Sequence, residues 1–334
     1  MGIVDNVLDS INKAFGFNEP IVYKDNSDLE EQYQALVKLN EEYPNNKKIV
    51  EKLKNVYYGN EGEKQVLYQL KKSNIGMYIL RDVKLIHEDL TAQIDFVILT
   101  PLYTYYIECK NELGNVIVNE KGDFIKEYKH DGQIIRRGMP SPLTQVEKQR
   151  DVIKRIWDGR TSNITKFFAS KHFNHYRRAL VVYANKFSIV DTSNAPDNIK
   201  HKVLRTDSLV RQMDYDYNHR DKDEVLLTKK QLEEAAESYM ELCDKYQEDW
   251  YSYYKDLYCG NNTEEVSDLK EKLRKFRSKR AAEMKYPPYY VFNNEELDKL
   301  VETKPKSIGE LDGILSPVKI RVHGAEIIKI INEG

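Results

Sequence analysis

The stretch QIDFVILTPLYTYYIECK, residues 93–110, constrains the fold of this chain more than any other. It contains two runs rich in Val, Ile and Tyr, as in buried β-strands, yet these runs carry Asp95, Glu108 and Lys110. The intervening Thr-Pro-Leu-Tyr predicts a hairpin with a four-residue loop, because Pro101 disfavours a two-residue primed turn. A buried charge needs a partner, so the three ionisable residues define a candidate site.

The register of this hairpin is expected to bring the two acids together. With an even-length loop centred on the Pro-Leu pair, Asp95 lies opposite Glu108 and Gln93 lies opposite Lys110. Side chains alternate along a strand, so all four should project from one face. Opposed carboxylates repel each other, and a divalent cation between them would turn that penalty into a binding site. Oxygen ligands of this kind favour Mg²⁺ or Mn²⁺ over zinc.

Two predicted helices direct further polar side chains toward the interior. Glu63 shares a helical face with three apolar residues, and Gln145 shares one with Gln149 and two apolar residues. We therefore expect Glu63 to be a third carboxylate near the site and Gln145 to supply an amide. A structural ion-pair cluster is the alternative interpretation of the acids and Lys110.

The order of predicted elements indicates an α/β domain followed by an all-α helical bundle. The sheet of the α/β domain should be mixed, and Asp131-Gly132 is a strong hairpin-turn signal. A helix should start near Ser141, which precedes Pro142, or at Thr144 with a capping box. The predicted divisions are an N-terminal helical segment at 1–56, the α/β domain at 57–220, a helical linker at 221–265 and a helical domain at 266–334.

The first helix of the C-terminal domain is strongly basic, with only three acids in its neighbourhood. One interpretation is a surface that binds nucleic acid, and the other is a solvated helix face. The basic residues are Lys270, Lys272, Arg274, Lys275, Arg277, Lys279 and Arg280.

Composition narrows the classes of partner and compartment. The formal net charge is −2, so any binding of nucleic acid must depend on local patches. No apolar run approaches the length of a membrane span, and the start of the chain does not resemble a secretory signal, so no membrane partner is expected. Three cysteines at unrelated spacings indicate a reducing cytoplasm rather than a disulfide framework.

The segments GNEGE, QIDFVIL, YYIECKNELGNV and PLTQVEKQ together resemble the nuclease-related domain NERD, a branch of the PD-(D/E)xK nuclease superfamily. The resemblance covers roughly residues 57–150 and implies a restriction-endonuclease-like mixed sheet flanked by helices. It implies that Glu63, Asp95 and Glu108 bind metal and that Lys110 is the catalytic lysine. By the same resemblance, Gln93 and Gln145 complete the site, and Cys109 contributes its backbone carbonyl to the metal.

The C-terminal segment, residues 266–333, resembles the helicase-and-RNase-D C-terminal domain HRDC through LRKFRSKRAAEMKYPPYYVFNNEELDKLVETKPKSIGELDGI and HGAEIIKII. Domains of this family often bind nucleic acid, and some mediate protein contacts. No G-x-x-x-x-G-K-[ST] motif occurs in the chain, so the sequence does not contain the usual helicase motor. A helicase or another DNA-processing protein is therefore a candidate partner.

These features predict a nuclease dependent on Mg²⁺ or Mn²⁺ that cleaves DNA, with the C-terminal domain helping to hold the substrate. Two alternatives remain open. The chain could keep the nuclease fold as a non-catalytic nucleic-acid-binding or scaffold protein, or its substrate could be RNA.

Overall fold

The computed structural model describes residues 16–87, 90–160, 173–221, 224, 226–243, 248–259, 268–284 and 286–332. Residues 1–15, the start of the predicted N-terminal helical segment, lie outside the described residues. The chain forms two compact units, one made of Met1–Tyr33 and Lys54–Asp244 and the other of Gln34–Leu53 and Lys245–Gly334. Two helices contribute to both units, α2 (Asp28–Glu42) and α3 (Lys47–Lys71).

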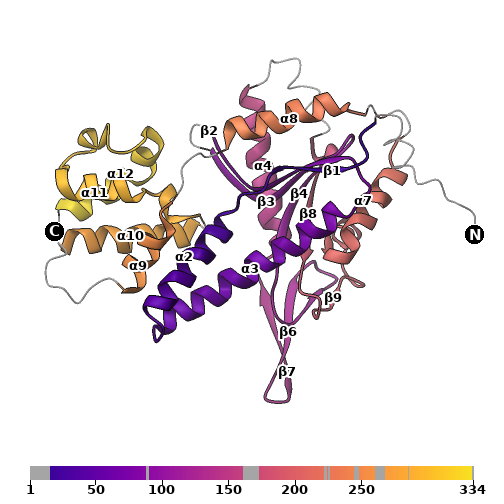
Figure 1. Cartoon of the computed structure of the whole chain (residues 1–334), viewed down its shortest axis with the longest axis horizontal. Coiled ribbons are helices and arrows are strands. Elements are labelled where there is room, and N and C mark those ends of the chain that lie inside the picture. Colours follow the sequence, from indigo (N-terminus) through magenta and orange to yellow (C-terminus); the bar gives the residue numbers. More distant parts are fainter. Residues whose placement is uncertain are drawn as a thin grey trace, which may run out of the picture. The chain divides into compact units, whose positions relative to one another are not determined.

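The first unit is built on a six-stranded mixed sheet with the order β1-β2-β3-β4-β8-β10 (Figure 1). β2, β3 and β4 pair in antiparallel fashion, whereas β1, β8 and β10 pair in parallel with their neighbours. This arrangement confirms the predicted α/β class and the mixed sheet. The strands are β1 (Pro20–Lys24), β2 (Met77–His87), β3 (Leu90–Leu99), β4 (Thr104–Lys110), β8 (Arg177–Tyr183) and β10 (Val203–Arg205).

β1 lies within the segment that the sequence pattern predicted to be helical. Its sequence, PIVYK, places Ile21, Val22 and Tyr23 in a row, and all three residue types favour strands. The strand pairs in parallel with β2, beginning with Pro20 beside Met77. A run of five residues is too short to show a period, so the tertiary pairing decides its conformation.

Helices cover both faces of the large sheet. α3 and α7 (Leu209–Asn218) bury Val66, Leu70 and Met213 against one face. α4 (Pro142–Arg160) and α8 (Lys229–Leu242) pack against the other face. α4 starts at Ser141, whose Oγ accepts a hydrogen bond from the Thr144 N–H over 3.1 Å, which decides between the two predicted starts.

The described part of the predicted linker, residues 221–265, contains two helices with different surroundings. α8 contributes Leu232, Ala236 and Tyr239 to the core of the first unit, and the Tyr239 hydroxyl lies 2.6 Å from the Tyr106 hydroxyl. α9 (Trp250–Cys259) belongs to the second unit. The segment therefore supplies core packing as well as a connection.

A second, four-stranded sheet in the first unit has the order β7-β6-β5-β9. The predicted turn at Asp131-Gly132 is confirmed, since both residues have positive φ, 48° and 81°, as a primed turn requires. The strands are β5 (Asn115–Val118), β6 (Phe124–His130), β7 (Gln133–Met139) and β9 (Val190–Asp191), and short helices α6 (Asp197–Lys200) and η1 (Thr206–Ser208) follow β9.

The second unit contains only helices among its described residues, which confirms the all-α C-terminal region. Its core gathers Leu273, Phe292, Leu300 and Ile327 from successive elements. No described helix is long and apolar enough to cross a membrane. The elements that follow α9 are α10 (Asp268–Met284), η2 (Pro288–Tyr290), α11 (Asn294–Thr303), η3 (Ile308–Leu311) and α12 (Pro317–Asn332).

Candidate active site

The β3–β4 hairpin has the predicted register and the predicted four-residue loop. Its ladder runs from Leu99 opposite Thr104 to Phe96 opposite Ile107. The loop closes through Thr100, whose N–H donates to the Tyr103 carbonyl over 3.0 Å. The next positions beyond the ladder are Asp95 and Glu108. The two acids therefore follow the paired part of the hairpin.

Asp95 contacts β4 directly across this end of the ladder. The backbone N–H of Cys109 donates to Asp95 Oδ2 over 2.7 Å. Burial raises the pKa of Asp95 well above its ordinary value, and the charges of Glu108 and Glu63 raise it further, against the opposing effects of Lys110 and this hydrogen bond. Like charges that resist joint ionisation lie close together here, as the sequence predicted.

Glu108 is 5% exposed and accepts two hydrogen bonds on one oxygen. Lys110 Nζ lies 2.6 Å from Glu108 Oε1, and Gln145 Nε2 donates to the same atom over 2.9 Å. The inward direction predicted for Gln145 is therefore confirmed. Burial alone would lower the pKa of Lys110, but Glu108 and Asp95 outweigh it and raise that pKa above its ordinary value.

Glu63 lies on the buried face of α3, as its helical spacing predicted, and is 4% exposed. Arg81 Nε donates to Glu63 Oε2 over 2.7 Å, and Ser27 Oγ donates to the same oxygen over 3.2 Å. Arg81 also donates to Asn60 Oδ1 over 2.8 Å, so its guanidinium is held from two sides. Burial raises the pKa of Glu63 to about 7, with Asp82 adding to the rise and Arg81 opposing it.

Gln93 does not reach Lys110. Its N–H donates to Gln149 Oε1 over 3.3 Å, and its side-chain amide donates to Asp82 Oδ1 over 3.0 Å. Side chains do not alternate regularly along this part of β3. Ile94 and Val97 lie in the same core cluster, although residues three apart on a regular strand point to opposite faces. β3 is therefore irregular between these residues.

Asp82 lies at the matching irregularity in β2, a position that sequence reasoning missed. Its φ is 49°, an uncommon conformation for a residue other than Gly, and its carboxylate is 7% exposed. The Asp28 N–H donates to Asp82 Oδ2 over 2.7 Å. The β2–β3 ladder pairs Arg81 with Phe96 and Val83 with Ile94, so Asp82 and Asp95 fall in the interval between these two pairs.

Carboxylate oxygens dominate the potential metal ligands of this cluster. Burial raises the pKa of the Cys109 thiol well above its ordinary value, which disfavours a thiolate ligand there. Among the described residues, no three His, Cys, Asp or Glu side chains are grouped so that they could hold a metal ion. Protein donors satisfy the acids instead: Arg81 for Glu63, the Cys109 N–H for Asp95, and Lys110 with Gln145 for Glu108.

Comparison with protein-family models gives two matches. The nuclease-related domain, NERD, matches residues 58–184, and the HRDC domain matches residues 267–331. The chain combines a NERD domain with a C-terminal HRDC domain. Both family resemblances inferred from the sequence are therefore confirmed. No curated protein and no solved structure matches the chain significantly.

The NERD match begins within α3 and ends directly after β8, so it contains Glu63, Asp95, Glu108, Lys110 and Gln145. It also contains Arg81 and Asp82, which the sequence pattern did not single out. A signal for Arg81 did exist, because MYILRDVKLI is otherwise an apolar strand and a charge in its middle must find a partner.

The basic residues of the HRDC domain are spread around α10 rather than gathered on one face. Arg277 is 2% exposed and donates to Asn294 Oδ1 over 2.9 Å. Lys270 pairs with Asp298 over 2.7 Å, and Arg280 lies near Glu283 and Glu326. These residues follow one another at offsets of one and two, and residues at such offsets point in different directions on a helix, which explains the spread. Lys272 is half-buried, whereas Lys275 and Lys279 are exposed.

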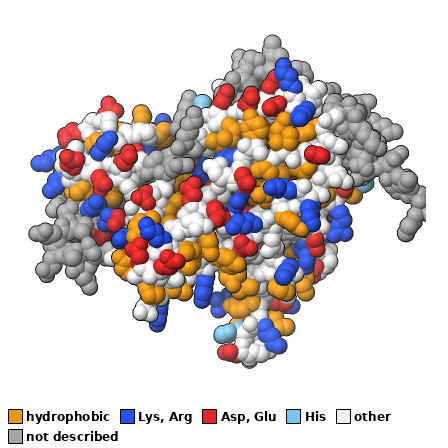
Figure 2. All heavy atoms as spheres, in the orientation of Figure 1, with side chains coloured by type: hydrophobic (Ala, Val, Ile, Leu, Met, Phe, Trp, Pro, Cys, Tyr) orange, Lys and Arg blue, Asp and Glu red, His pale blue; other side chains and the backbone are white. Residues whose placement is uncertain are grey.

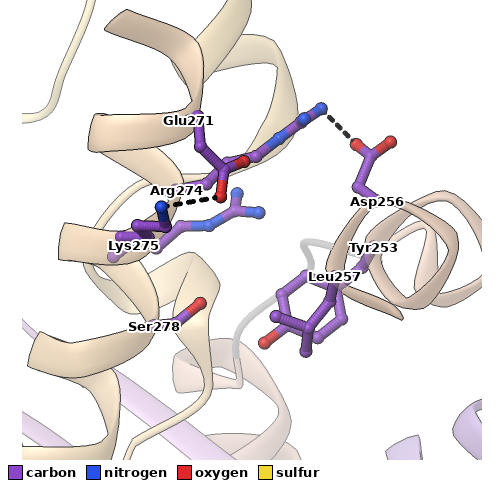
Figure 3. Close-up of a pocket in the computed structure, with 8 residues that line it drawn as sticks. Tyr253, Asp256, Leu257, Glu271, Arg274, Lys275 and Ser278 are labelled. Atoms are coloured by element: carbon purple, nitrogen blue, oxygen red, sulfur yellow. Dashed lines mark hydrogen bonds and ion pairs between the residues drawn. The ribbon is translucent and has the colours of Figure 1, made fainter. Parts of the chain in front are cut away.

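A cavity of about 200 Å³ lies between α9 and α10 in the HRDC-containing unit (Figure 3). On its rim Arg274 pairs with Asp256 over 2.5 Å, and Lys275 pairs with Glu271 over 3.4 Å. Figure 3 shows both pairs as dashed contacts. Arg274 is therefore held by its ion pair with Asp256, whereas the ion pair of Lys275 is exposed and weak.

Proposed function

We propose that this chain is a metal-dependent nuclease that hydrolyses phosphodiester bonds in DNA. The observation that carries the proposal is the arrangement of Asp95, Glu108 and Lys110 at the end of the β3–β4 ladder. Two carboxylates and an ammonium group meet there inside a nuclease-related domain. Such a site can stabilise the charge that develops during phosphoryl transfer.

Two carboxylates offer oxygen donors to a hard divalent cation, although no third acid is grouped with them among the described residues. Asp95 and Glu108 would supply carboxylate oxygens, and the Cys109 backbone carbonyl would be a further oxygen ligand. Lys110 and Gln145 both donate to Glu108 Oε1, and neither donates to Oε2. Oxygen-only ligands suit Mg²⁺ or Mn²⁺, which when bound would act as a Lewis acid on a phosphate oxygen. Glu63 is the candidate third carboxylate.

Lys110 is suited to donate rather than to accept protons. Its pKa is raised above the ordinary value by Glu108 and Asp95 although burial opposes this, so the side chain stays cationic near neutral pH. A cationic Lys110 can orient water through its N–H groups and neutralise charge on a phosphate oxygen.

Gln145, Gln93 and Arg81 act as positioning residues in this proposal. Gln145 fixes the Glu108 carboxylate from α4. Gln93 connects α4 with Asp82 through its N–H and its amide. Arg81 holds the Glu63 carboxylate in the interior and reduces the cost of burying it.

The HRDC domain supports nucleic acid as the partner, because domains of this family often bind nucleic acid. Lys275 and Lys279 are the exposed cations of α10 and are the candidates for phosphate contacts. A helicase or another DNA-processing protein remains a proposed partner.

A cleavage assay on supercoiled plasmid tests the proposal, with Mg²⁺, Mn²⁺ or a chelator and with a matched RNA substrate. We expect cleavage of DNA with either metal, none with the chelator, and none for Glu108→Gln. Faster cleavage of RNA would identify an RNA-directed nuclease. Binding of DNA without cleavage under every metal condition would identify a non-catalytic binding or scaffold protein.

A further inference from the structure

The β6–β7 hairpin extends beyond the sheet that supports it. β5 pairs with β6 only from Val118 beside Phe124 to Asn115 beside Glu127. The β6–β7 ladder continues past this point to His130 opposite Gln133. The outer part of the hairpin is therefore a two-stranded ribbon, and Figure 1 shows it projecting from the small sheet.

The core of the protein does not explain this extension. Residues 129–134 are all exposed, including Ile134 at 67%. An isolated two-stranded hairpin is marginally stable in water, so the ribbon gains little by its own packing. A projecting element that adds no core contact is expected to have a partner outside the unit.

The whole β6–β7 hairpin, residues 124–139, has four basic and two acidic residues, although the whole chain is slightly acidic. Figure 2 shows His, acidic and Lys or Arg side chains together at the tip of this projection. Glu127 neutralises Arg136 over 2.8 Å, and Glu112 neutralises Lys126 over 2.9 Å. The other two basic residues, Lys129 and Arg137, are exposed and form no ion pair within the described part of the chain.

The cross-strand register places cations and an aromatic ring in turn on one face of the hairpin, and Lys129 projects from the opposite face. Lys126 lies directly opposite Arg137, and the next pair on that face is Tyr128 opposite Ile135. Like charges directly opposite each other destabilise a hairpin. A bound anion would relieve the repulsion that remains after Glu112 has neutralised Lys126.

The base of the ribbon is fixed close to the candidate active site. Glu112, whose carboxylate accepts from Lys126 over 2.9 Å, follows Lys110 by two positions in the segment that leaves β4. Gly114 has a φ of 98°, and a Cβ there would lie 2.7 Å from the Glu127 carbonyl oxygen. The absence of a side chain at Gly114 permits this close approach, and the pairing of Asn115 with Glu127 attaches β6 to the segment that leaves β4.

We propose that the β6–β7 hairpin is an arm that binds a DNA duplex beside the active site, with Lys129 and Arg137 contacting backbone phosphates. This inference rests on the proposed function for the identity of the substrate. A two-stranded ribbon fits the major groove, which is about 12 Å wide. Lysine and arginine contacts to phosphate position the duplex without reading its sequence.

Protection of an edge strand is the competing explanation, because β7 ends the small sheet and charges on an edge discourage pairing with other chains. The two explanations differ in what neutralising the charges changes. If the hairpin is a DNA-binding arm, removing its charges weakens DNA binding and reduces the salt dependence of that binding. If the charges protect the edge strand, removing them makes the protein self-associate.

The test compares the full-length Lys129→Gln/Arg137→Gln variant with a matched control, Lys71→Gln/Lys230→Gln, in the same unit. Both control lysines are exposed and lie outside the ribbon, so the two variants lose equal charge. Binding to a fluorescent DNA duplex is followed by anisotropy with a chelator present, between about 50 and 200 mM salt. The same variants are assayed for cleavage with Mg²⁺.

We expect the arm variant to bind about tenfold more weakly and to lose about two units of the slope of log K against log salt, while the control stays near the parent. Cleavage at saturating DNA should be unchanged and KM should rise. Equal slopes for the parent and the arm variant would overturn the arm, as would an equal loss in the control. Light scattering that rises without a change in DNA binding would assign the charges to edge protection and overturn the arm.

A second variant replaces residues 129–134 with Asn-Gly, which closes the shortened hairpin at the Tyr128–Ile135 pair. This variant loses Lys129 but keeps Arg137, so its affinity for DNA should lie between those of the parent and the double substitution. A larger loss on single-stranded than on duplex DNA would overturn the duplex as the ligand. Absence of binding and cleavage by the parent protein would refute the proposed function itself, whereas cleavage by the parent with an unaltered arm variant would refute only the arm.

Discussion

Arg81 and Glu63 form a buried ion pair, in which Arg81 Nε donates to Glu63 Oε2 over 2.7 Å and the side chains are 5% and 6% exposed. The pair joins β2 to α3 beside the two acids of the β3–β4 hairpin. It explains how a carboxylate can occupy the apolar face of α3, since a buried charge is tolerated when a cation and hydrogen bonds compensate it.

Breaking this pair from one side should destabilise the protein strongly. At about pH 8, above the folded pKa of Glu63, Arg81→Met should lower the free energy of unfolding by about 3–5 kcal/mol, because it leaves a buried carboxylate without its cation. Glu63→Gln/Arg81→Met removes both charges and should lose less than the sum of the single variants. Urea denaturation of the parent, both single variants and the double variant measures this coupling. Additive losses would contradict the pair as a stabilising contact.

Asp95→Asn and Lys110→Ala should change metal-free stability in opposite directions. Burial and the charge of Glu108 raise the pKa of Asp95 in the folded protein, so at neutral pH this carboxyl costs stability, and Asp95→Asn removes that cost. The asparagine keeps an oxygen that can accept from the Cys109 N–H, so the melting temperature should rise. Lys110→Ala removes the cation beside Glu108, so the melting temperature should fall. Both variants should fail to cleave DNA.

Thermal melts of the two variants with and without Mg²⁺ separate the site from a structural ion-pair cluster. In the proposed site, Asp95→Asn should also lose the increase in melting temperature that Mg²⁺ gives the parent protein. A structural cluster instead predicts that Asp95→Asn is destabilised, because Lys110 loses part of its compensation. A destabilised Asp95→Asn protein that still cleaves DNA would overturn the catalytic assignment of Asp95.

Binding of a divalent cation should release protons near neutral pH. The pKa of Asp95 is raised by burial and by Glu108, so the metal-free carboxyl binds a proton more tightly than an ordinary Asp does, and a cation must compete with that proton. Titration calorimetry with Mn²⁺ in buffers of different ionisation enthalpy should give heats that differ between buffers. Asp95→Asn should reduce that difference, and identical heats for the parent in every buffer would exclude proton release.

The hairpin register could be predicted from the sequence because an even loop length fixes every cross-strand pair at once. The ladder from Leu99 opposite Thr104 to Phe96 opposite Ile107 follows from that single parameter. Glu63 and Gln145 could be predicted because their helices are long enough to show a period. These predictions depend only on the regular repeat of side-chain directions along a strand or a helix.

The irregularity at Asp82 and Asp95 could not be predicted in the same way. Alternation carried back through Asp95 puts Gln93 beside Lys110, but the irregular backbone turns its amide to Asp82 instead. An Asp at positive φ leaves no mark in a hydrophobicity pattern. The sequence likewise predicted the hairpin but not that its outer part extends beyond the sheet, because the length of the supporting strand β5 depends on tertiary pairing.

His323 should make the stability of the HRDC-containing unit depend on pH. Burial lowers its pKa to about 4, with Arg280 contributing in the same direction. The unfolded state, with an ordinary value of about 6.5, then binds more protons between these two values. Stability should therefore be complete above about pH 6.5 and fall by up to about 3 kcal/mol as the pH drops to 4.

Fluorescence of the full-length protein can isolate this unit. The chain has two tryptophans, and Trp250 belongs to the second unit, so a Trp157→Phe background reports that unit alone. In this background His323→Gln should flatten the pH dependence of urea unfolding between pH 6.5 and 4. His219→Gln, at an exposed site in the first unit, serves as the control. An unchanged slope in His323→Gln would show that other groups cause the acid sensitivity.

The HRDC domain should contribute to DNA affinity through the exposed lysines of α10. Lys275→Gln/Lys279→Gln should weaken binding and reduce the slope of log K against log salt by about two units, since each phosphate contact contributes about 0.9. Lys304→Gln/Lys306→Gln is the matched control, because it removes two exposed lysines from the same domain outside α10. Arg277 is unsuitable for this test, since its buried guanidinium holds Asn294 and its loss would destabilise the fold.

Anisotropy titrations at several salt concentrations compare the two variants with the parent, and cleavage at saturating DNA should be equal in all three. An unchanged slope for the α10 variant would assign the HRDC domain to protein contacts instead of phosphate binding.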